Sequence, residues 1–138
     1  YVSMEQEVAM LAAQNAGHPI DTLKPCVSLS DVLAFRHDVT EVRISDEIYR
    51  YIVAIVSATR KMAGVQLGAS PRASLALASV AQALAVFDGM EFVTPDHVQE
   101  LAEATIAHRI ALDPEAKFAG RSAGDIVAKI VESIPVPH

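Results

Sequence analysis

The chain has 138 residues, a formal net charge of −6 at pH 7, 51 % hydrophobic residues and only 5 % aromatic ones, with no Trp. The length predicts one domain, and the composition favours closely packed helices of Ala, Val, Ile and Leu over a sheet sandwich. The acidic balance argues against non-specific binding to nucleic acid or to an anionic membrane.

The N-terminal part of the chain predicts one helix followed by a loop. Ser3 and Gln6 have the spacing of a capping box, so the helix should begin at Met4, and Gly17 is a suitable C-terminal stop. Helical periodicity places four of its side chains on one inward face: Met4, Val8, Leu11 and Ala12. The prolines and the glycine of residues 17–27 predict a loop.

Residues 31–62 predict two further helices joined by a short extended link. Ser30 is the expected N-cap of a helix over residues 31–39, and its inward side chains should be Val32, Phe35 and Val39. Residues 40–44 favour extended structure. Ser45 then caps a third helix, whose apolar side chains form one stripe. Arg50 lies off that stripe, and we expect its side chain to be solvated. That stripe consists of Ile48, Ile52, Ile55, Thr59 and Met62.

The longest predicted helix begins at Pro71 and ends at Phe87. Ser70 is a good N-cap and Pro71 a good first residue, because the N–H that Pro lacks has no partner at that position. No charge follows Arg72 within this helix, so we expect it to run through the middle of a bundle. Arg72 lies in the first turn, where unpaired N–H groups attract anions. It predicts a phosphate-type anion site or, as the plainer alternative, a salt bridge or a solvated side chain.

The last third of the chain predicts an extended link at Phe92-Val93, then a helix, a turn and a final helix. Thr94-Pro95 begins the first of these helices by the same combination of cap and proline. Asp113-Pro114 begins a turn or short helix, and the last helix follows the capping spacing of Ser122 and Asp125. Together these elements predict an all-α bundle of about five to six helices with short extended links.

Motifs of catalysis and metal binding are absent from the sequence. It has no GxxxxGK(S/T) phosphate loop, no GxSxG elbow and no HExxH or other histidine spacing that suits a metal ion. We therefore expect no metal site and no catalysis by this chain alone. Cys26 is the single cysteine, which predicts a reducing, cytoplasmic compartment. The longest uncharged run falls short of the roughly 20 residues of a membrane-spanning helix, so we expect no membrane span.

The segment from Leu67 to Leu77, LGASPRASLAL, resembles the sensor-2 segment of MoxR-type AAA+ ATPases, a family related to the magnesium-chelatase ATPase subunit. Residues 61–64 and His97 depart from the family pattern at positions that we expect on the surface. The resemblance covers essentially the whole chain. Further similar segments follow in the family's order: MEQEV at 4–8, YIV at 51–53, ATR at 58–60, FVTPDHV at 92–98, HRI at 108–110 and SIPVP at 133–137.

The resemblance implies that residues 1–138 form the C-terminal lid domain of an AAA+ ATPase, whose core domain lies N-terminal to residue 1 and binds most of ATP and Mg²⁺. Arg72 is then the sensor-2 arginine and reaches the β- and γ-phosphates in cis or in trans. Ala69, Ser70 and Pro71 are implied as further nucleotide-binding residues beside it. Interface or structural roles are implied for three more residues: His108, Arg109 and Arg60.

The same resemblance implies a homo-oligomeric ring, commonly a hexamer, and a von Willebrand factor A-domain protein as partner. It also implies chaperone-like maturation of client proteins, or metal-cofactor insertion into them. The alternative is a free-standing helical interaction module, in which residues 71–98 form a histone-like helix pair without a nucleotide role. A phosphate-loop sequence upstream of Tyr1 would distinguish the ATPase lid from this module.

Overall fold

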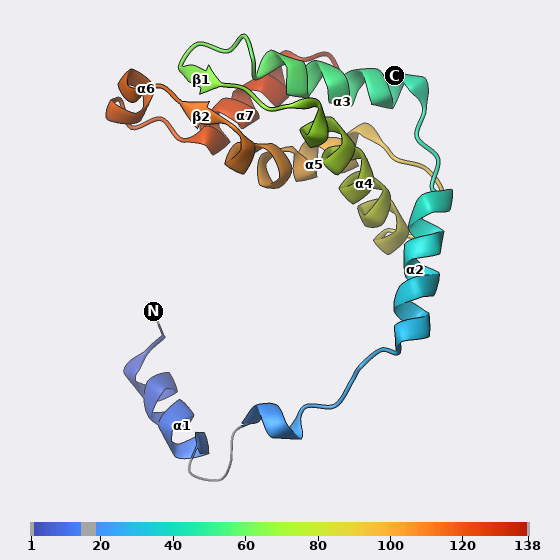
Figure 1. The fold of residues 1–138 in the computed structure, drawn as a ribbon, viewed down its shortest axis with the longest axis vertical. Helices are drawn as coiled ribbons and strands as arrows, with labels where there is room; N and C mark the ends of the chain where they lie inside the picture. The colour runs from blue at the N-terminus through green and yellow to red at the C-terminus, as the bar shows by residue number, and fades with distance from the viewer. Residues whose placement is uncertain (1, 15–18, 138) are drawn as a thin grey trace. The chain divides into compact units, whose positions relative to one another are not determined.

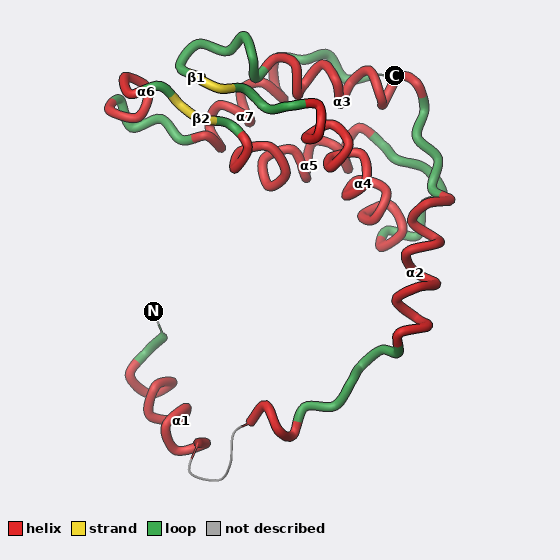
Figure 2. The backbone as a smooth tube through the Cα atoms, viewed as in Figure 1, coloured by secondary structure: helices red, strands yellow, loops and turns green. Residues whose placement is uncertain are grey.

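The computed structural model describes residues 2–14 and 19–137. Over these residues the chain forms seven α-helices and a two-stranded sheet, which confirms the predicted helical fold (Figure 2). Its contacts define two compact units, Tyr1–Ala34 and Phe35–His138. The helices are α1 Met4–Gln14, α2 Leu29–Glu41, α3 Asp46–Ala58, α4 Pro71–Phe87, α5 Pro95–Ile106, α6 Pro114–Phe118 and α7 Ala123–Ser133; the strands are β1 Val65–Leu67 and β2 Ala111–Leu112, and 3₁₀ turns occur at Pro19–Thr22 and Ala107–Arg109.

Helix α1 begins where its cap predicts, but its apolar face is exposed. The Gln6 N–H donates to Ser3 Oγ at 3.3 Å, and the Ser3 N–H donates to Gln6 Oε1 at 2.9 Å. The expected inward face is wrong, since Met4 is 78 % exposed and Val8, Leu11 and Ala12 are exposed as well. Periodicity predicts which side chains share a face, whereas burial requires a second surface to cover them. The expected stop at Gly17 lies outside the described residues.

Helix α2 is longer than predicted at both ends. Ser28 rather than Ser30 forms the capping box, because the Asp31 N–H donates to Ser28 Oγ at 3.2 Å and the Ser28 N–H donates to Asp31 Oδ2 at 2.8 Å. The helix continues through Glu41, which shortens the expected extended link. Of its expected inward side chains, Val32 is exposed, and Phe35 and Val39 are half-buried.

What remains of the extended link is a single parallel bridge between Arg43 and Phe92. The Arg43 N–H donates to the carbonyl oxygen of Glu91 at 3.0 Å, and the Val93 N–H donates to the carbonyl oxygen of Arg43 at 2.9 Å. The bridge joins the chain before α3 to the chain before α5, a pairing between the two extended segments that the sequence did not predict.

The core of the second unit forms where α3, α4, α5 and α7 pack together (Figure 1). Helix α4 contacts α3 and α5, and α5 contacts α7. The predicted stripe of α3 is buried at Ile48, Ile52, Ile55 and Thr59, while Met62 is half-buried in the following loop. Full burial of one aliphatic side chain contributes about 1.5–3 kcal/mol. The largest fully buried aliphatic side chains are Ile52, Ile55, Leu77, Ile106 and Ile130.

Helix α4 has the predicted bounds, but it is buried on only one side. Its buried side chains recur every fourth residue: Ala73, Leu77, Ala81 and Ala85. Leu75 and Phe87 are 70 % and 75 % exposed, so the expectation of an all-round buried helix is wrong. Because three members of the buried row are alanines, the neighbouring helices can approach this one face closely.

Sequence reasoning missed the short sheet. Val65 pairs with Leu112 and Leu67 with Ala111 in an antiparallel arrangement. The Asp113 N–H donates to the carbonyl oxygen of Gly64 at 3.0 Å, which extends the same connection. Strands of two or three residues are too short for apolar alternation to reveal them.

His97 is buried, at 5 % exposure, which corrects its expected surface position. It occupies the third position of α5, where a capping box turns its ring back over the helix start. The Thr94 N–H donates to His97 Nδ1 at 3.1 Å, and the His97 N–H donates to Thr94 Oγ1 at 3.4 Å. Because Nδ1 accepts, the neutral ring carries its proton on Nε2, which lies 3.2 Å from Asp88 Oδ2.

Candidate functional site

The candidate site is the segment Gly68–Arg72, which connects β1 to the first turn of α4. Ser70 has the extended backbone of an N-cap, with φ −79° and ψ 167°, and Pro71 follows at the first helical position. The Ala73 N–H donates to the carbonyl oxygen of Ser70 at 2.9 Å and closes the first turn. The Ser70 side chain makes no capping hydrogen bond, so its predicted position is confirmed while its hydroxyl leaves the helix start uncapped.

Ala69 is held through both of its backbone polar groups. Its N–H donates to Thr59 Oγ1 at 2.9 Å, and its carbonyl oxygen accepts from Arg60 Nε at 2.8 Å. Thr59 is fully buried, and its hydroxyl donates to the carbonyl oxygen of Val56 at 2.6 Å. Losing either partner would leave a backbone group of a fully buried residue unpaired, at a cost of about 1–3 kcal/mol. The end of α3 therefore fixes the chain that leads to Arg72.

Gly68 can lie directly against the backbone of Arg60 because glycine has no side chain. A Cβ at this position would lie 2.6 Å from Arg60 Cα and 2.8 Å from the Arg60 backbone nitrogen. Both separations are far below a normal non-bonded contact, and backbone atoms cannot swing away as a flexible side chain can. Residue 68 must therefore be glycine for the segment to lie against Arg60.

Arg72 is exposed, and its guanidinium has no partner among the described residues. Over residues 2–14 and 19–137, neither Arg72 nor Arg60 forms an ion pair, and Arg72 makes no side-chain hydrogen bond. The alternative interpretation, a salt bridge between Arg72 and a nearby carboxylate, is therefore not seen among the described residues. An uncompensated cation beside the N–H groups of a helix start attracts anions.

His108 and Arg109 lie just beyond the C-terminal end of α5. They follow α5, where His108 Nδ1 is 3.1 Å from the carbonyl oxygen of Ala104 and Arg109 Nε donates to the carbonyl oxygen of Thr105 at 2.9 Å. Polar side chains at this position satisfy carbonyl groups that the helix itself leaves unpaired. No hydrogen bond or ion pair among the described residues joins either side chain to Arg72.

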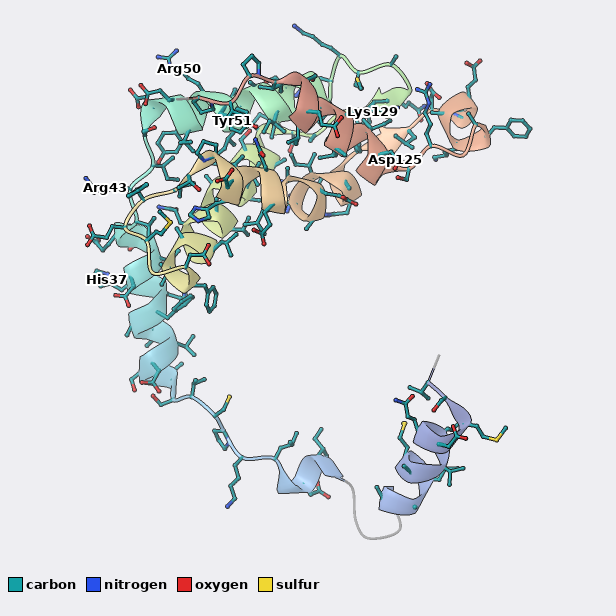
Figure 3. All side chains as sticks on the ribbon, turned by 180° about the vertical axis from the view of Figure 1, so that it is seen from behind. His37, Arg43, Arg50, Tyr51, Asp125 and Lys129 are labelled. Carbon is teal, nitrogen blue, oxygen red and sulfur yellow. The ribbon has the colours of Figure 1, made fainter. Side chains whose placement is uncertain are left out.

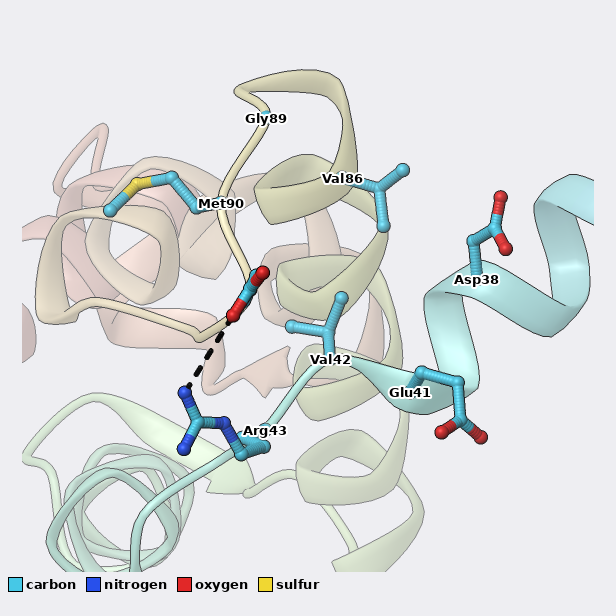
Figure 4. A pocket seen from close by; sticks show the side chains of 8 residues that line it. Asp38, Glu41, Val42, Arg43, Val86, Gly89 and Met90 are labelled. Atoms are coloured by element: carbon cyan, nitrogen blue, oxygen red, sulfur yellow. Dashed lines mark ion pairs between the residues drawn. The ribbon is translucent and has the colours of Figure 1, made fainter.

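A pocket of about 390 Å³ lies at the opposite end of α4 from Arg72 (Figure 4). Its lining includes Asp38, Glu41 and the pair of Arg43 and Glu91, whose side-chain atoms are 4.0 Å apart. Both members of this pair are highly exposed, so their attraction contributes little. The acidic lining does not suit a phosphate, and this pocket is separate from the segment Gly68–Arg72.

Shifted pKa values occur at helix caps. Hydrogen bonds from the Ser122 hydroxyl and then from its N–H lower the pKa of Asp125, which lies on α7 with Lys129 (Figure 3). The same two groups of Ser28 lower the pKa of Asp31. Arg50, also labelled in Figure 3, is exposed on α3 as predicted. Within residues 2–14 and 19–137, no group of three or more potential metal ligands occurs.

Sequence reasoning missed the roles of Thr59 and Gly68. The pattern placed Thr59 in an aliphatic stripe and assigned no structural role to Gly68. A hydroxyl within an otherwise aliphatic stripe is the available signal, because a buried hydroxyl needs a hydrogen-bond partner. Its partner is ten residues away at Ala69 and could not be identified from the stripe.

Residues 57–130 match the family described as the AAA lid domain. The chain is 44 % identical over 137 residues to the uncharacterized protein YeaC of Bacillus subtilis, covering 99 % of this chain and 43 % of YeaC. It is 27 % identical to the chaperone MoxR1 of Mycobacterium tuberculosis over 147 residues, which cover all of this chain and 38 % of MoxR1.

A crystal structure of a "putative ATPase" from Cytophaga hutchinsonii superposes on the whole chain with a TM-score of 0.84 at 31 % identity. The match covers 44 % of that protein, so the chain spans less than half the length of each of these relatives. None of the described helices is long and apolar enough to cross a membrane. From the family match, the similarity to MoxR1 and the shared fold, the chain belongs to the AAA lid domain family and is a lid of the MoxR type.

Proposed function

We propose that this chain is the sensor-2 lid of an AAA+ ATPase and that Arg72 contacts the β- and γ-phosphates of ATP. The observation that carries the proposal is the unpaired, exposed Arg72 in the first turn of α4, on a segment bonded to the end of α3. A guanidinium with several fixed N–H donors suits phosphate oxygens. It stabilises the negative charge that develops on the phosphoryl group during hydrolysis.

The remaining parts of the ATPase belong to a core domain on the same polypeptide, N-terminal to residue 1. That domain would hold most of ATP and Mg²⁺, while Ala69, Ser70 and Pro71 bring Arg72 to the nucleotide. Arg72 acts on the core of its own subunit or on that of a neighbour. Arg109 and His108 support the end of α5 or an interface.

At the level of biology, we propose a homo-oligomeric ring, a hexamer, in the cytoplasm. It acts with a von Willebrand factor A-domain protein in the chaperone-like maturation of clients, including metal-cofactor insertion. The similarity to the chaperone MoxR1 supports the chaperone-like part of this role, and the remainder rests on the sequence resemblance. A histone-like pairing of α4 and α5 has less support, because α4 already packs against α3 and α5 against α7.

Substitution of Arg72 by Ala in the full-length ATPase tests the proposal. We expect ATP turnover to fall roughly 10²-fold, because a preorganised cation at the transferred phosphoryl group is lost. The Arg72 side chain is exposed and forms no hydrogen bond or ion pair with another described residue. The melting temperature should therefore stay close to that of the unmodified protein.

Arg50→Ala is the matched control, since Arg50 is an exposed arginine on α3 without an ion pair among the described residues. Its turnover should equal that of the unmodified protein. Turnover of Arg72→Ala as high as that of Arg50→Ala would contradict the sensor-2 role.

A further inference from the structure

We propose that Arg60 is a positioning residue, which acts on ATP hydrolysis only by holding the segment that carries Arg72. This inference rests on the proposed sensor-2 function. Its basis is that Thr59 and Arg60, at the end of α3, form hydrogen bonds with both backbone polar groups of Ala69. Thr59 accepts from the Ala69 N–H at 2.9 Å, and Arg60 donates to the Ala69 carbonyl oxygen at 2.8 Å.

These two bonds stabilise a junction that would otherwise be flexible. Gly68 directly precedes Ala69, and glycine has more backbone freedom than any other residue type. Rotation at Gly68 would displace Ala69 and Ser70, which lead into the first turn of α4. Two interactions with Arg60 oppose this rotation. One is the close approach of Gly68 to the Arg60 backbone, and the other is the hydrogen bond from Arg60 Nε to the Ala69 carbonyl oxygen.

No hydrogen bond or ion pair among the described residues orients the Arg72 side chain toward an anion. Its guanidinium is unpaired over the described residues, so its placement depends on the backbone beneath it. Pro71 restricts φ at the first helical position, and Ala69, two residues earlier, is fully buried and bonded. Fixing Ala69, together with the burial of Ala73, therefore holds the start of α4 and the backbone of Arg72 in place.

The interaction that Arg60 makes with the segment needs a hydrogen-bond donor and no charge. The bond to Ala69 uses Nε, which lies at the same number of bonds from the backbone as the amide nitrogen of glutamine. A glutamine at position 60 can therefore donate to the same carbonyl oxygen without a positive charge. A methionine has a similar length and no donor, so the two variants separate the hydrogen bond from side-chain size.

The experiment compares Arg60→Gln, Arg60→Met, Arg72→Ala and the double variant Arg60→Met/Arg72→Ala in the full-length ATPase, with kcat and KM for ATP as the readouts. We expect Arg60→Met to lower kcat about tenfold, because a small misplacement of a catalytic group has a large effect on rate. KM should change less than about twofold, since the interaction matters in the transition state. Arg60→Gln should keep kcat within about threefold of the unmodified protein.

The double variant tests whether Arg60 acts through Arg72. If it does, Arg60→Met has no further effect once Arg72 is removed, and the double variant matches Arg72→Ala within about twofold. Additive losses, or equal losses for Arg60→Gln and Arg60→Met, would show that the charge of Arg60 acts on the nucleotide directly and would overturn the proposal. An Arg60→Met enzyme as active as the unmodified protein would overturn it as well.

Failure of this inference is distinguishable from failure of the proposed function. If Arg72→Ala keeps normal turnover, the sensor-2 role itself fails. If Arg72→Ala is impaired and Arg60→Met is not, only the positioning role fails. Because Arg60→Met leaves the Ala69 carbonyl oxygen unpaired and should melt at a lower temperature, the rates are compared at a temperature at which circular dichroism shows both variants to be fully folded, so that a rate difference does not reflect unfolding.

Discussion

Single polar side chains determine how several helices of this lid begin. Ser45 Oγ accepts from the Ile48 N–H at 3.3 Å at the start of α3, and Asp113 Oδ1 accepts from the Ala116 N–H at 2.7 Å at the start of α6. Each bond satisfies an N–H group that the helix cannot pair internally, and each is worth about 1 kcal/mol. Ser70 is the exception, because its hydroxyl makes no such bond. The helix start that carries Arg72 thus lacks a side-chain cap.

The capping box of α7 predicts a pH dependence of stability. Hydrogen bonds from Ser122 lower the pKa of Asp125 from its ordinary value of 3.8, so the folded state favours the ionised carboxylate. This contribution to the free energy of unfolding is complete above pH 3.8 and is lost as the pH falls through the lowered folded-state pKa. Asp125→Asn should therefore be less stable than the unmodified chain at pH 7, and the difference should shrink in acid.

Urea unfolding of both chains between pH 7 and pH 3 measures this difference. Glu132→Gln is the control, because Glu132 is exposed on the same helix and makes no hydrogen bond or ion pair with another described residue. A stability gap for Asp125→Asn that stays constant over this range would contradict the assignment.

At the scale of the element, α4 combines a buried row of small side chains with an exposed apolar face. The buried row approaches its neighbours closely and includes one large residue, Leu77. The opposite face carries Arg72 and Leu75. Since Arg72 must meet the nucleotide in our proposal, this exposed face of α4 is the side that turns toward the ATPase core.

The asymmetry of α4 predicts opposite outcomes for two leucines in the same helix. Leu77 is completely buried and Leu75 is 70 % exposed. Leu77→Ala should lower the free energy of unfolding by about 3 kcal/mol, because it removes packed methyl groups and leaves a cavity. Leu75→Ala should change it by less than about 0.5 kcal/mol. Urea denaturation of the 138-residue chain provides the comparison, and equal losses for both variants would contradict one-sided burial.

At the scale of the whole molecule, burial begins only at Val42. Every side chain described between residues 2 and 41 is exposed or half-buried, although this stretch contains several apolar residues. The buried side chains all belong to the unit Phe35–His138. A hydrophobic contribution to stability requires removal of apolar area from water, so this unit contains the main source of stability.

Removal of residues 1–27 should therefore leave the thermal unfolding of the second unit unchanged. The shortened chain begins at Ser28 and keeps the capping box with Asp31. Its melting temperature should lie within about 2 °C of that of the 138-residue chain, since no described side chain of residues 2–27 is buried. Circular dichroism measures the transition, and a decrease of more than about 5 °C would show that these residues pack on the rest of the protein.

The sequence by itself determined where α4 begins and ends, where α3, α5 and α7 are capped, and that Arg72 lies in the first turn of α4. These features depend on residues within about four positions of one another, so local patterns reveal them. Only the tertiary structure decided which face of α4 is buried, that the apolar face of α1 is exposed and that His97 is buried. It alone brought Thr59 and Arg60 to Ala69 and paired β1 with β2. These features depend on contacts between residues far apart in the chain, and burial requires a covering surface that periodicity cannot specify.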